Sequence, residues 1–309
     1  MRIIFFGSPA EAAESLKSLI SEGHNIAAVY TRPDRRAGRG RASTPTPVKT
    51  MALENGLPVC TPARLQNNEQ EFAQLADAHV DVFVVVAYGR ILPPEILSIP
   101  PMGVVNVHPS LLPQYRGPSP VVTAILDGQA QTGVTVMLLD EGMDTGPILA
   151  QSPPVQLNGT EKGASLQALL FNEGAAMLPA VLKGLQDGSI TPTPQDDALA
   201  TVTGLLDRSD GEIDWSLSAE QIGRMVRAYD PWPGTFTTWN GKGLKILDAE
   251  LTNESRDDPG KVSVTDGRLI VGTGSGSLEI TRLQLEGRRS VTTLDFLRGQ
   301  PQITGATLG

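Results

Sequence analysis

Residues 2–30 read RIIFFGSPAEAAESLKSLISEGHNIAAVY, and this stretch decides the fold class. Arg2–Gly7 and Asn25–Tyr30 are short apolar runs, which are typical of buried strands. Between them, Pro9–Ser21 carries alanine and leucine at helical spacing, and Gly23 follows as a helix end. A strand, a helix and a second strand in this order indicate a parallel, doubly wound α/β sheet.

The same alternation of strands and helices continues further along the chain. Val80–Ala87 is the most continuous apolar run, and we expect it to be a central strand that is buried on both faces. The last helix of this part, Ser165–Leu185, contains Gly174 and Pro179, which we expect to bend or split it. The other predicted strands are Leu57–Cys60, Val104–His108 and Gly133–Leu139, and the other helices are Pro47–Asn55, Gln70–Ala78 and Pro120–Leu126.

A polar, proline-containing segment separates this part from the rest of the chain. Ser189–Ala200 reads SITPTPQDDALA, which predicts a linker. Beyond it, Ser218–Tyr229 is a predicted helix that begins with a capping box formed by Ser218 and Gln221. Short strands with glycine or asparagine turns follow, and their spacing is typical of a small β-barrel. We therefore expect a Rossmann-like catalytic domain over residues 1–188, a linker over 189–208 and a β-barrel domain over 209–309.

Composition excludes several classes of protein. The 309 residues carry a formal net charge of -9, which argues against a surface that binds phosphates everywhere. The single cysteine, Cys60, rules out a disulfide framework and a cysteine-based zinc module. The apolar runs are too short to predict a membrane span, and the opening residues enter a strand without a signal peptide. We expect a soluble, cytoplasmic monomer that binds neither a metal nor a membrane.

The turn after the first strand departs from known nucleotide-binding motifs. A dinucleotide fingerprint needs three glycines in G-x-G-x-x-G, but Pro9 and Ala12 stand at the second and third of these positions. Pro9 also lacks the backbone N–H that would bind a phosphate. The sequence contains no P-loop, Ser110 is not in a G-x-S-x-G elbow, and the three histidines lack H-E-x-x-H spacing. These patterns argue against nucleotide, serine-hydrolase and zinc-hydrolase chemistry.

The most informative stretch lies between Val104 and Gly146. Asn106 and His108 are two residues apart at the end of a predicted strand, so their side chains lie on the same face. Pro109 cannot donate the next ladder hydrogen bond, so we expect the strand to end there. Ligands bind at the carboxyl ends of parallel strands. An amide and an imidazole at such an end could stabilise a developing oxyanion and move a proton.

Three acids follow in the segment LLDEGMDTGPI: Asp140, Glu141 and Asp144. One interpretation is a solvated turn between two glycines. The other is that one carboxylate folds back to orient His108 and to raise its basicity. The spacing alone does not choose among the three acids.

These residues carry a resemblance to a known family. NVHPSLLPQYRG at 106–117, followed by DEGMDTG at 140–146, is similar to the signature of folate-dependent formyltransferases. That family includes enzymes that act on glycinamide ribonucleotide, on formyltetrahydrofolate itself, on sugar amines and on methionyl-tRNA. The resemblance to the tRNA branch covers nearly the whole chain, because it includes RIIFFGSP, TRPDRRAGRGR, VVVAYGRILP and the later IDW and RAYDPWPG. The signature marks only the superfamily, whereas the arginine-rich loop and the C-terminal motifs are far more specific to the tRNA branch.

The resemblance implies a fold, a reaction and a set of site residues. The fold would be a Rossmann-like formyltransferase N-terminal domain plus a C-terminal barrel similar to an OB fold, which binds tRNA. The reaction would transfer the formyl group of 10-formyltetrahydrofolate, the donor substrate, to the amine of methionyl initiator tRNA. Asn106, His108 and Asp144 match the catalytic trio of the family. The residues that match its folate-contacting motif are Ser110, Leu111, Leu112 and Pro113, and those that would border the pterin pocket are Val86, Tyr88 and Gly89.

A basic loop offers a binding surface for tRNA in an otherwise acidic protein. Residues 32–49 carry six cationic side chains against one carboxylate, a net charge of +5. Composition alone favours a solvated, flexible loop, because glycine, proline, serine and threonine are frequent there. The resemblance favours contact with acceptor-stem phosphates, for which the candidates are Arg32, Arg35, Arg36, Arg39 and Arg41.

One position departs from the tRNA branch. A lysine is usual shortly before the IDW motif, where Leu205 stands here and Arg208 is the nearest cation. Three alternatives stay open. They are a sugar-amine formyltransferase, which would not need the arginine loop; a formyltetrahydrofolate hydrolase, in which water replaces the amine; and a non-catalytic RNA-binding module, in which the trio would be dispensable.

Overall fold

The chain folds into two compact units. The computed structural model describes residues 1–37, 42–252, 254 and 258–309. The first unit comprises Met1–Pro120, Gln131–Gln156 and Gln167–Thr203, and the second comprises Val121–Ala130, Leu157–Leu166 and Gly204–Gly309. The domain boundaries expected from the sequence remain a prediction.

A seven-stranded sheet forms the centre of the first unit, with the strand order β10-β9-β7-β6-β1-β2-β5. The strands from β7 to β5 run parallel, whereas β9 runs antiparallel to both β7 and β10. The predicted doubly wound fold is therefore confirmed, and the strand of opposite direction in this sheet is β9, next to the edge strand β10. Mixed sheets of this kind are common. The strands are β1 (Arg2–Gly7), β2 (Asn25–Tyr30), β5 (Val59–Cys60), β6 (Val82–Val86), β7 (Val104–His108), β9 (Thr135–Leu138) and β10 (Ile148–Gln151).

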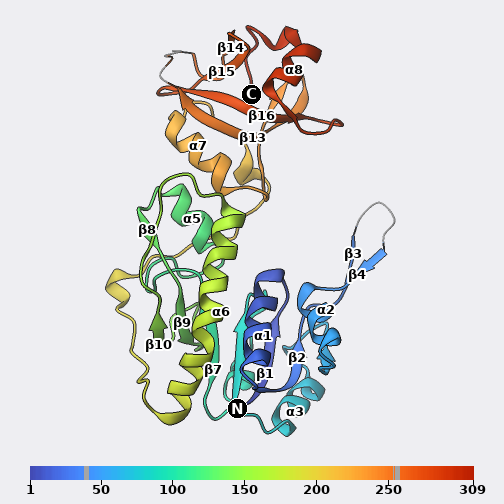
Figure 1. Ribbon diagram of the computed structural model, residues 1–309, viewed down its shortest axis with the longest axis vertical. Coiled ribbons are helices and arrows are strands. Elements are labelled where there is room, and N and C mark those ends of the chain that lie inside the picture. Colours follow the sequence, from blue (N-terminus) through green and yellow to red (C-terminus); the bar gives the residue numbers. More distant parts are fainter. Residues whose placement is uncertain (38–41, 253, 255–257) are drawn as a thin grey trace. The chain divides into compact units, whose positions relative to one another are not determined.

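Helices cover both faces of this sheet. Helices α1 (Ala10–Ser21) and α6 (Gly163–Asp187) lie side by side over one face (Figure 1). On the other face, Leu75 and Ile96 pack in an apolar cluster with Phe6 and Phe83. Leu75 belongs to α3 (Glu69–Asp77) and Ile96 to α4 (Pro94–Leu97). Helix α2 (Pro47–Glu54) precedes β5.

Helix α6 is continuous over 25 residues, so it is not split at Gly174 and Pro179 as the sequence suggested. A Cβ atom at Gly174 would lie 2.4 Å from Cγ1 of Val107, so this glycine lets the helix approach β7 closely. By length and composition, α6 could also cross a membrane, so the expectation that no segment qualifies was wrong. Its apolar residues are interrupted by polar ones and form no obvious run. A core helix passes the same test, and 44% of its most apolar window is buried inside the protein.

The arginine-rich loop contains a short antiparallel ribbon that the sequence did not predict. Strand β3 (Arg35–Ala37) pairs with β4 (Ala42–Thr44), and Figure 1 shows the ribbon projecting away from the parallel sheet. Strands of three residues have no readable periodicity. Arg39 and Arg41 lie outside the described residues. A second short pair joins β8 (Gln131–Thr132) to β11 (Val155–Gln156).

An antiparallel sheet forms the second unit, with the order β12-β13-β16-β15-β14 and β17 paired to β16. The end of the chain links the two edge strands. The N–H of Val262 in β14 donates to the carbonyl of Ala306 at 2.9 Å, and the N–H of Gly309 donates to the carbonyl of Thr238 in β12 at 3.1 Å. Through these bonds the end of the chain connects β14 to β12, the two edge strands of the sheet, as the closure of a barrel requires. The strands are β12 (Thr235–Trp239), β13 (Lys242–Thr252), β14 (Val262–Thr265), β15 (Arg268–Gly272), β16 (Ser277–Leu285) and β17 (Val291–Thr292).

Helix α7 (Ala219–Ala228) begins with the predicted capping box. The backbone N–H of Gln221 donates to Oγ of Ser218 at 3.2 Å, and the N–H of Ser218 donates to Oε1 of Gln221 at 3.1 Å. The apolar face of α7 joins the core of the sheet through Ile222 and Val226. The remaining helices are α5 (Pro120–Leu126), α8 (Thr293–Gly299) and the single turns Asp197–Leu199, Ser209–Gly211 and Pro301–Ile303.

Candidate active site

Asn106 and His108 lie at the carboxyl end of β7, as the sequence predicted. They share the face of Val104, which packs in the apolar cluster with α3 and α4, whereas Val107 points to α6. Both polar side chains are largely removed from water, because Asn106 is 9% exposed and His108 is 4% exposed. Two buried polar groups at a strand end are therefore the first component of a candidate site.

Each ring nitrogen of His108 faces a hydrogen-bond acceptor. Its Nε2 donates to the carbonyl of Tyr115 at 2.9 Å, and its Nδ1 lies 3.6 Å from Oδ2 of Asp144. The second distance is too long for a direct hydrogen bond, so this carboxylate acts on the ring through its charge. Burial lowers the pKa of His108 below its usual value, while Asp144 and the Tyr115 carbonyl act in the opposite direction. The ring is thus neutral near pH 7, with a carboxylate ready to stabilise its protonated form.

The structure selects Asp144 from the three acids of the segment. Its Oδ2 accepts the backbone N–H of Gly117 at 2.8 Å, and its backbone has a φ of 54°. Asp140 instead accepts from the N–H of Gly142 at 3.0 Å and from the hydroxyl of Thr145 at 2.7 Å. Asp140 therefore stabilises the turn itself, and Asp144 is the acid that reaches His108.

Gly117 holds Asp144 because it has no side chain. Its φ is 102°, and a Cβ atom there would lie 2.8 Å from the carbonyl oxygen of Thr203. Only glycine fits this backbone conformation and this close contact without displacement. The glycine of the QYRG motif thus positions the N–H that binds the Asp144 carboxylate.

The Asn106 amide is available to a ligand. Within the described part of the chain, its side chain makes no hydrogen bond to another residue. Asn106 is not among the residues whose unpaired polar atoms are fully buried, so its amide still reaches solvent. A site that keeps such a donor open is suited to an oxygen atom of a bound substrate.

The loop from Ser110 to Pro113 is fixed by two residues that the sequence did not single out. The hydroxyl of Thr135, the residue opposite His108 in β9, donates to the carbonyl of Ser110 at 2.7 Å and accepts the N–H of Leu112 at 3.0 Å. The amide of Gln151 donates to the carbonyl of Leu112 at 2.8 Å. Thr135 lies in the predicted strand Gly133–Leu139, which reads only as an apolar segment, and the strand that contains Gln151 was not predicted. Leu111 and Pro113 are partly buried, and Ser110 and Leu112 are buried.

The predicted pterin-side residues leave the sheet beside His108. Val85 of β6 pairs with Asn106 of β7, so the turn after Val86 lies next to the candidate site. Tyr88 is buried, and its ring packs edge-on against Phe6 at 5.4 Å between centroids. Gly89 has a φ of 73°. The backbone of this turn, rather than its side chains, therefore faces any ligand at the strand ends.

Ser8 is a buried residue that joins the same strand ends. Its hydroxyl donates to the carbonyl of Tyr88 at 3.3 Å and accepts the N–H of Arg32 at 3.3 Å. It thereby connects the residues after β1, β2 and β6. Ser8 lies in the turn after β1, which lacks the dinucleotide-binding motif. Its position in that turn could have indicated a structural role at the strand ends.

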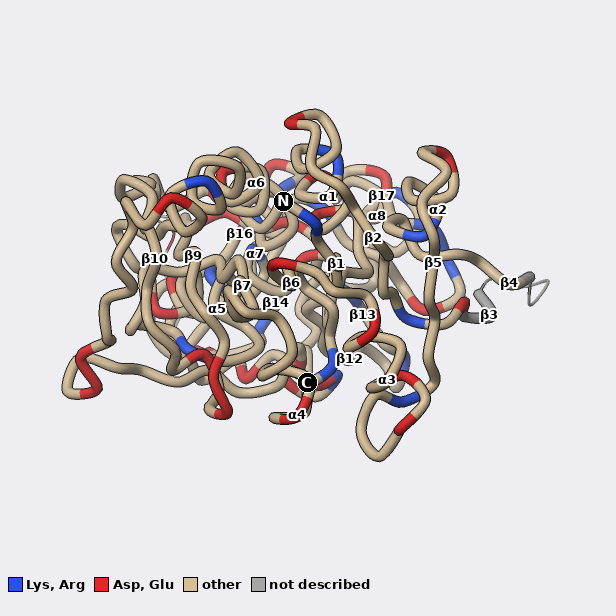
Figure 2. Tube along the Cα trace, turned by 90° about the horizontal axis from the view of Figure 1, so that it is seen from below, with Lys and Arg blue, Asp and Glu red and all other residues tan. Residues whose placement is uncertain are grey.

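The arginine-rich loop begins at this edge of the sheet. The guanidinium of Arg32 donates to the carbonyl of Gly89, so this side chain holds a turn of the site. Lys49 pairs with Asp34 at 2.8 Å, which neutralises part of the local charge. Arg35 and Arg36 lie on β3. Figure 2 shows Lys and Arg and Asp and Glu dispersed along a trace that is mostly of other residues.

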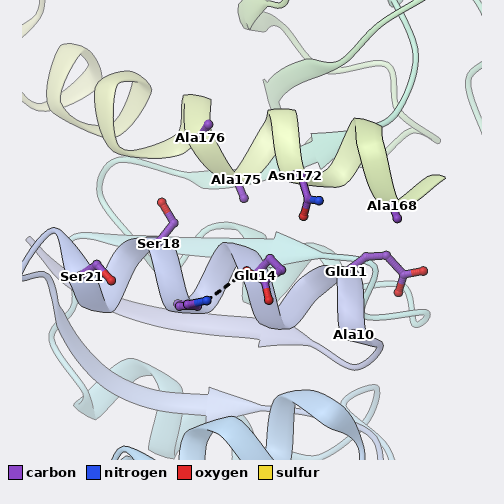
Figure 3. A pocket seen from close by; sticks show the side chains of 10 residues that line it. Ala10, Glu11, Glu14, Ser18, Ser21, Ala168, Asn172, Ala175 and Ala176 are labelled. Atoms are coloured by element: carbon purple, nitrogen blue, oxygen red, sulfur yellow. Dashed lines mark ion pairs between the residues drawn. The ribbon is translucent and has the colours of Figure 1, made fainter. Parts of the chain in front are cut away.

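A groove lies elsewhere in the first unit. It has a volume of about 620 Å³ and lies between α1 and α6 (Figure 3). Ala175 and Ala176 of α6 lie across from Ser18 of α1, and Ala168 lies across from Glu11. Lys17, which also lines the groove, pairs with Glu14. No residue of the strand-end site lines this groove. Across the described ranges, no group of three or more His, Cys, Asp or Glu residues could hold a metal ion.

Comparison with known proteins agrees with this arrangement. Residues 1–182 match the family described as formyl transferase, and residues 205–301 match the formyl transferase C-terminal domain. A methionyl-tRNA formyltransferase of Roseiflexus castenholzii is 49% identical over 312 residues, covering 100% of this chain and 99% of the relative. The chain belongs to the methionyl-tRNA formyltransferase family. A relative of the same name from Dehalococcoides mccartyi is 44% identical over 100% of this chain and 99% of its own length.

Solved structures share the fold of this formyltransferase family member. HypX from Aquifex aeolicus, in complex with tetrahydrofolic acid, has a TM-score of 0.66 at 20% identity over 97% of this chain. The chain spans about half of that protein, since it covers 47% of HypX. An N-formyltransferase from Helicobacter canadensis, in complex with folinic acid and dTDP-3-aminofucose, has a TM-score of 0.66 at 18% identity over 90% of this chain and 98% of its own.

Proposed function

We propose that this formyltransferase moves the formyl group of 10-formyltetrahydrofolate to the α-amino group of methionyl initiator tRNA, for translation initiation. The observation that carries the proposal is 49% identity over the whole chain to a protein named methionyl-tRNA formyltransferase. The geometry supports the chemistry. His108 and Asp144 lie 3.6 Å apart at a strand end, on the face that also presents the Asn106 amide.

His108 is the proposed general base and general acid. Its Nε2–H is donated to the Tyr115 carbonyl, so the neutral ring carries its free lone pair on Nδ1. Nδ1 accepts the proton that the attacking amine loses. It returns a proton to the folate nitrogen as the bond between that nitrogen and the formyl carbon breaks. Asp144 stabilises the imidazolium that exists between the two steps.

Asn106 is the proposed donor to the formyl oxygen. Negative charge develops on this oxygen while the amine attacks the formyl carbon, and the Nδ2–H groups of Asn106 can bind it. An amide that is already oriented costs no reorganisation at this point, and one such donor typically lowers the barrier by about 3–4 kcal/mol. The amide makes no hydrogen bond within the described residues, which keeps it available.

The folate donor is proposed to bind against the ends of β6 and β7. Its pterin ring carries amide-like donors and acceptors, which suit the exposed backbone groups of a turn better than a charged side chain. The proposed contacts are the turn at Val86, Tyr88 and Gly89 and the loop at Ser110, Leu111, Leu112 and Pro113. The carbonyls of Tyr88, Gly89, Ser110 and Leu112 are bound within the protein, so the N–H groups of Tyr88, Gly89 and Leu111 are the ones proposed to bind the pterin. HypX, which shares the fold, was solved with tetrahydrofolic acid, and this supports a folate at the same kind of fold.

The tRNA is proposed to bind the arginine-rich loop and the barrel over residues 209–309. The loop starts at the edge of the sheet that holds the site, so a phosphate backbone bound there would bring its aminoacyl end towards His108. The candidates are Arg32, Arg35, Arg36, Arg39 and Arg41. We propose that the enzyme acts as a monomer in the cytoplasm, where its tRNA substrate is found.

An acceptor comparison tests the proposal. Purified protein is incubated with 10-formyltetrahydrofolate and, in parallel, with methionyl initiator tRNA, an amino-sugar nucleotide or no acceptor. We expect formylation of the tRNA only, with a rate that falls steeply as salt rises. Formylation of the amino sugar without the tRNA would contradict the proposal, and so would release of formate at an equal rate without acceptor.

A further inference from the structure

A segment that reads as a linker in the sequence packs along the strand-end site. Residues 193–203, which we name the strap, are held at both ends. Thr193 and Ile148 exchange two backbone hydrogen bonds of 2.8 Å. At the other end, the N–H of Arg116 donates to the carbonyl of Thr201 at 2.9 Å, and the N–H of Thr203 donates to the carbonyl of Arg116 at 2.7 Å.

Gln195 is the residue of the strap that contacts the Asp144 loop. Its amide nitrogen donates to the carbonyl of Asp144 at 2.8 Å and to the carbonyl of Gly146 at 2.7 Å. Its amide oxygen accepts from Nε of Arg116 at 3.0 Å. Both donors and the acceptor of this side chain are therefore used, and all its partners are near the site.

Arg116 connects Gln195 to the other partner of His108. Arg116 is 7% exposed, and its guanidinium is held by Gln195 and by Asp197 at 2.7 Å. It stands between Tyr115, whose carbonyl binds Nε2 of His108, and Gly117, whose N–H binds Asp144. Gln195 thus joins the two loops that contact His108 from opposite sides of the ring.

The two loops need such support because of their backbone conformations. Tyr115 has a φ of 60° and Asp144 a φ of 54°, a region that residues with a side chain rarely occupy. These conformations persist only where the surroundings fix them. The Asp144 peptide is fixed at its carbonyl by Gln195, and its carboxylate is fixed by Gly117.

We propose that Gln195 is a positioning residue, which holds the Asp144 loop against Arg116 and so sets the distance between the Asp144 carboxylate and His108. The kinetic part of this proposal rests on the proposed function, whereas the geometric part does not. Among the described residues, Asp144 is the charged group that faces His108. The charge of Arg116 is paired with Asp197. A displaced Asp144 therefore leaves His108 buried without its carboxylate.

Gln195→Met and Gln195→Ala test the proposal, because neither side chain can donate to the two carbonyls. Histidine labelled with 13C at Cε1 is titrated by NMR, and the chain has only three histidines to assign. We expect the midpoint of His108 to move to lower pH in both variants. We also expect kcat to fall by about tenfold at unchanged KM for the folate donor, because the Asp144 carboxylate is displaced but still present.

Asp196→Asn is the matched control. Asp196 is the neighbouring residue on the strap and caps the turn Asp197–Leu199, a role that asparagine retains. We expect it to leave the His108 midpoint and kcat unchanged. Thermal unfolding of each variant shows that the chain is folded at the assay temperature.

The results separate this proposal from the proposed function. A His108 midpoint that stays at the wild-type value in both folded Gln195 variants would overturn the positioning role. A shifted midpoint in a protein that fails to formylate methionyl-tRNA would support the positioning role and refute the proposed substrate instead. A loss of kcat without a shift of the His108 midpoint would also overturn the positioning role. Such a loss would indicate a general loosening of the fold in which the Asp144 charge has not moved.

Discussion

The strand-end site of the first unit and the core of the second unit differ in what they bury. The site largely removes an imidazole and an amide from water and holds Asp144 and Tyr115 at positive φ. The core of the second unit gathers apolar side chains that alternate along antiparallel strands, such as Leu278 and Ile280 on β16, and packs them with Ile222 of α7. At the site, buried polar groups and residues at positive φ occur together, whereas the positive φ values of Asn240 and Asp266 in the second unit fall in the turns between paired strands. This difference indicates that the first region is organised for chemistry and the second for stability.

His108→Ala gives the largest effect that this comparison predicts. The variant lacks the group that accepts and returns the proton, so kcat should fall by about 10²–10⁴-fold while the fold is retained. Single-turnover formylation of methionyl-tRNA measures the loss. His24→Ala, which removes a histidine between α1 and β2, is the matched control and should keep the wild-type rate. Near wild-type turnover by folded His108→Ala would contradict the assignment of the site.

Asn106→Ala should have the next largest effect. Removing one donor to a developing oxyanion typically costs about 10²–10³-fold in kcat. The loss should appear in kcat rather than in KM for either substrate, because the charge exists only in the transition state. Steady-state kinetics with both substrates varied checks this. A rise in KM at constant kcat would mean that Asn106 binds the ground state.

Ile280→Ala examines the other region. Ile280 is fully buried in the second unit, and its truncation should lower the free energy of unfolding by about 2–5 kcal/mol. Denaturant unfolding measures this loss, and Ile280→Val should cost only about 0.5–1.5 kcal/mol. The rate of the chemical step per folded molecule should stay unchanged. A changed single-turnover rate at saturating substrate would break the distinction between the two regions.

Arg36→Ala should have the smallest effect. If Arg36 contacts one phosphate, its loss should weaken tRNA binding and reduce the slope of log affinity against log salt by about one. Binding titrations at several salt concentrations measure both quantities. Arg64→Ala removes an exposed arginine outside the loop and should leave the slope unchanged. An unchanged slope for Arg36→Ala would remove this residue from the proposed tRNA surface.

The elements that depend on residues close together in the sequence could be predicted. Strands Arg2–Gly7, Asn25–Tyr30 and Val104–His108 have the predicted bounds, because short apolar runs bounded by glycine or proline leave little choice. The capping box of α7 was also predicted, since it depends on residues three positions apart. The shared face of Asn106 and His108 follows from the period of two along a strand.

The supports of the site could not be predicted, because they depend on distant partners. Gln195 binds residues 49, 51 and 79 positions away, and its own segment reads only as polar and proline-rich. The spacing of Asp140, Glu141 and Asp144 did not distinguish the acid that reaches His108. That choice depends on the positive φ of Asp144 and on the N–H of Gly117, neither of which leaves a periodic pattern.

The central claim is that the Asp144 carboxylate acts on His108 at the end of β7. Its most direct test is the pH dependence of single-turnover formyl transfer in Asp144→Asn, with Glu141→Gln as the control. Burial lowers the pKa of His108 and Asp144 raises it, so removing this charge lowers the pKa further. Because the neutral ring is the proposed base, the rate falls as pH drops through that pKa. We predict that this fall moves to lower pH in Asp144→Asn, with a lower plateau, and stays in place in Glu141→Gln. A fall that stays in place in Asp144→Asn, or moves to higher pH, would contradict the account.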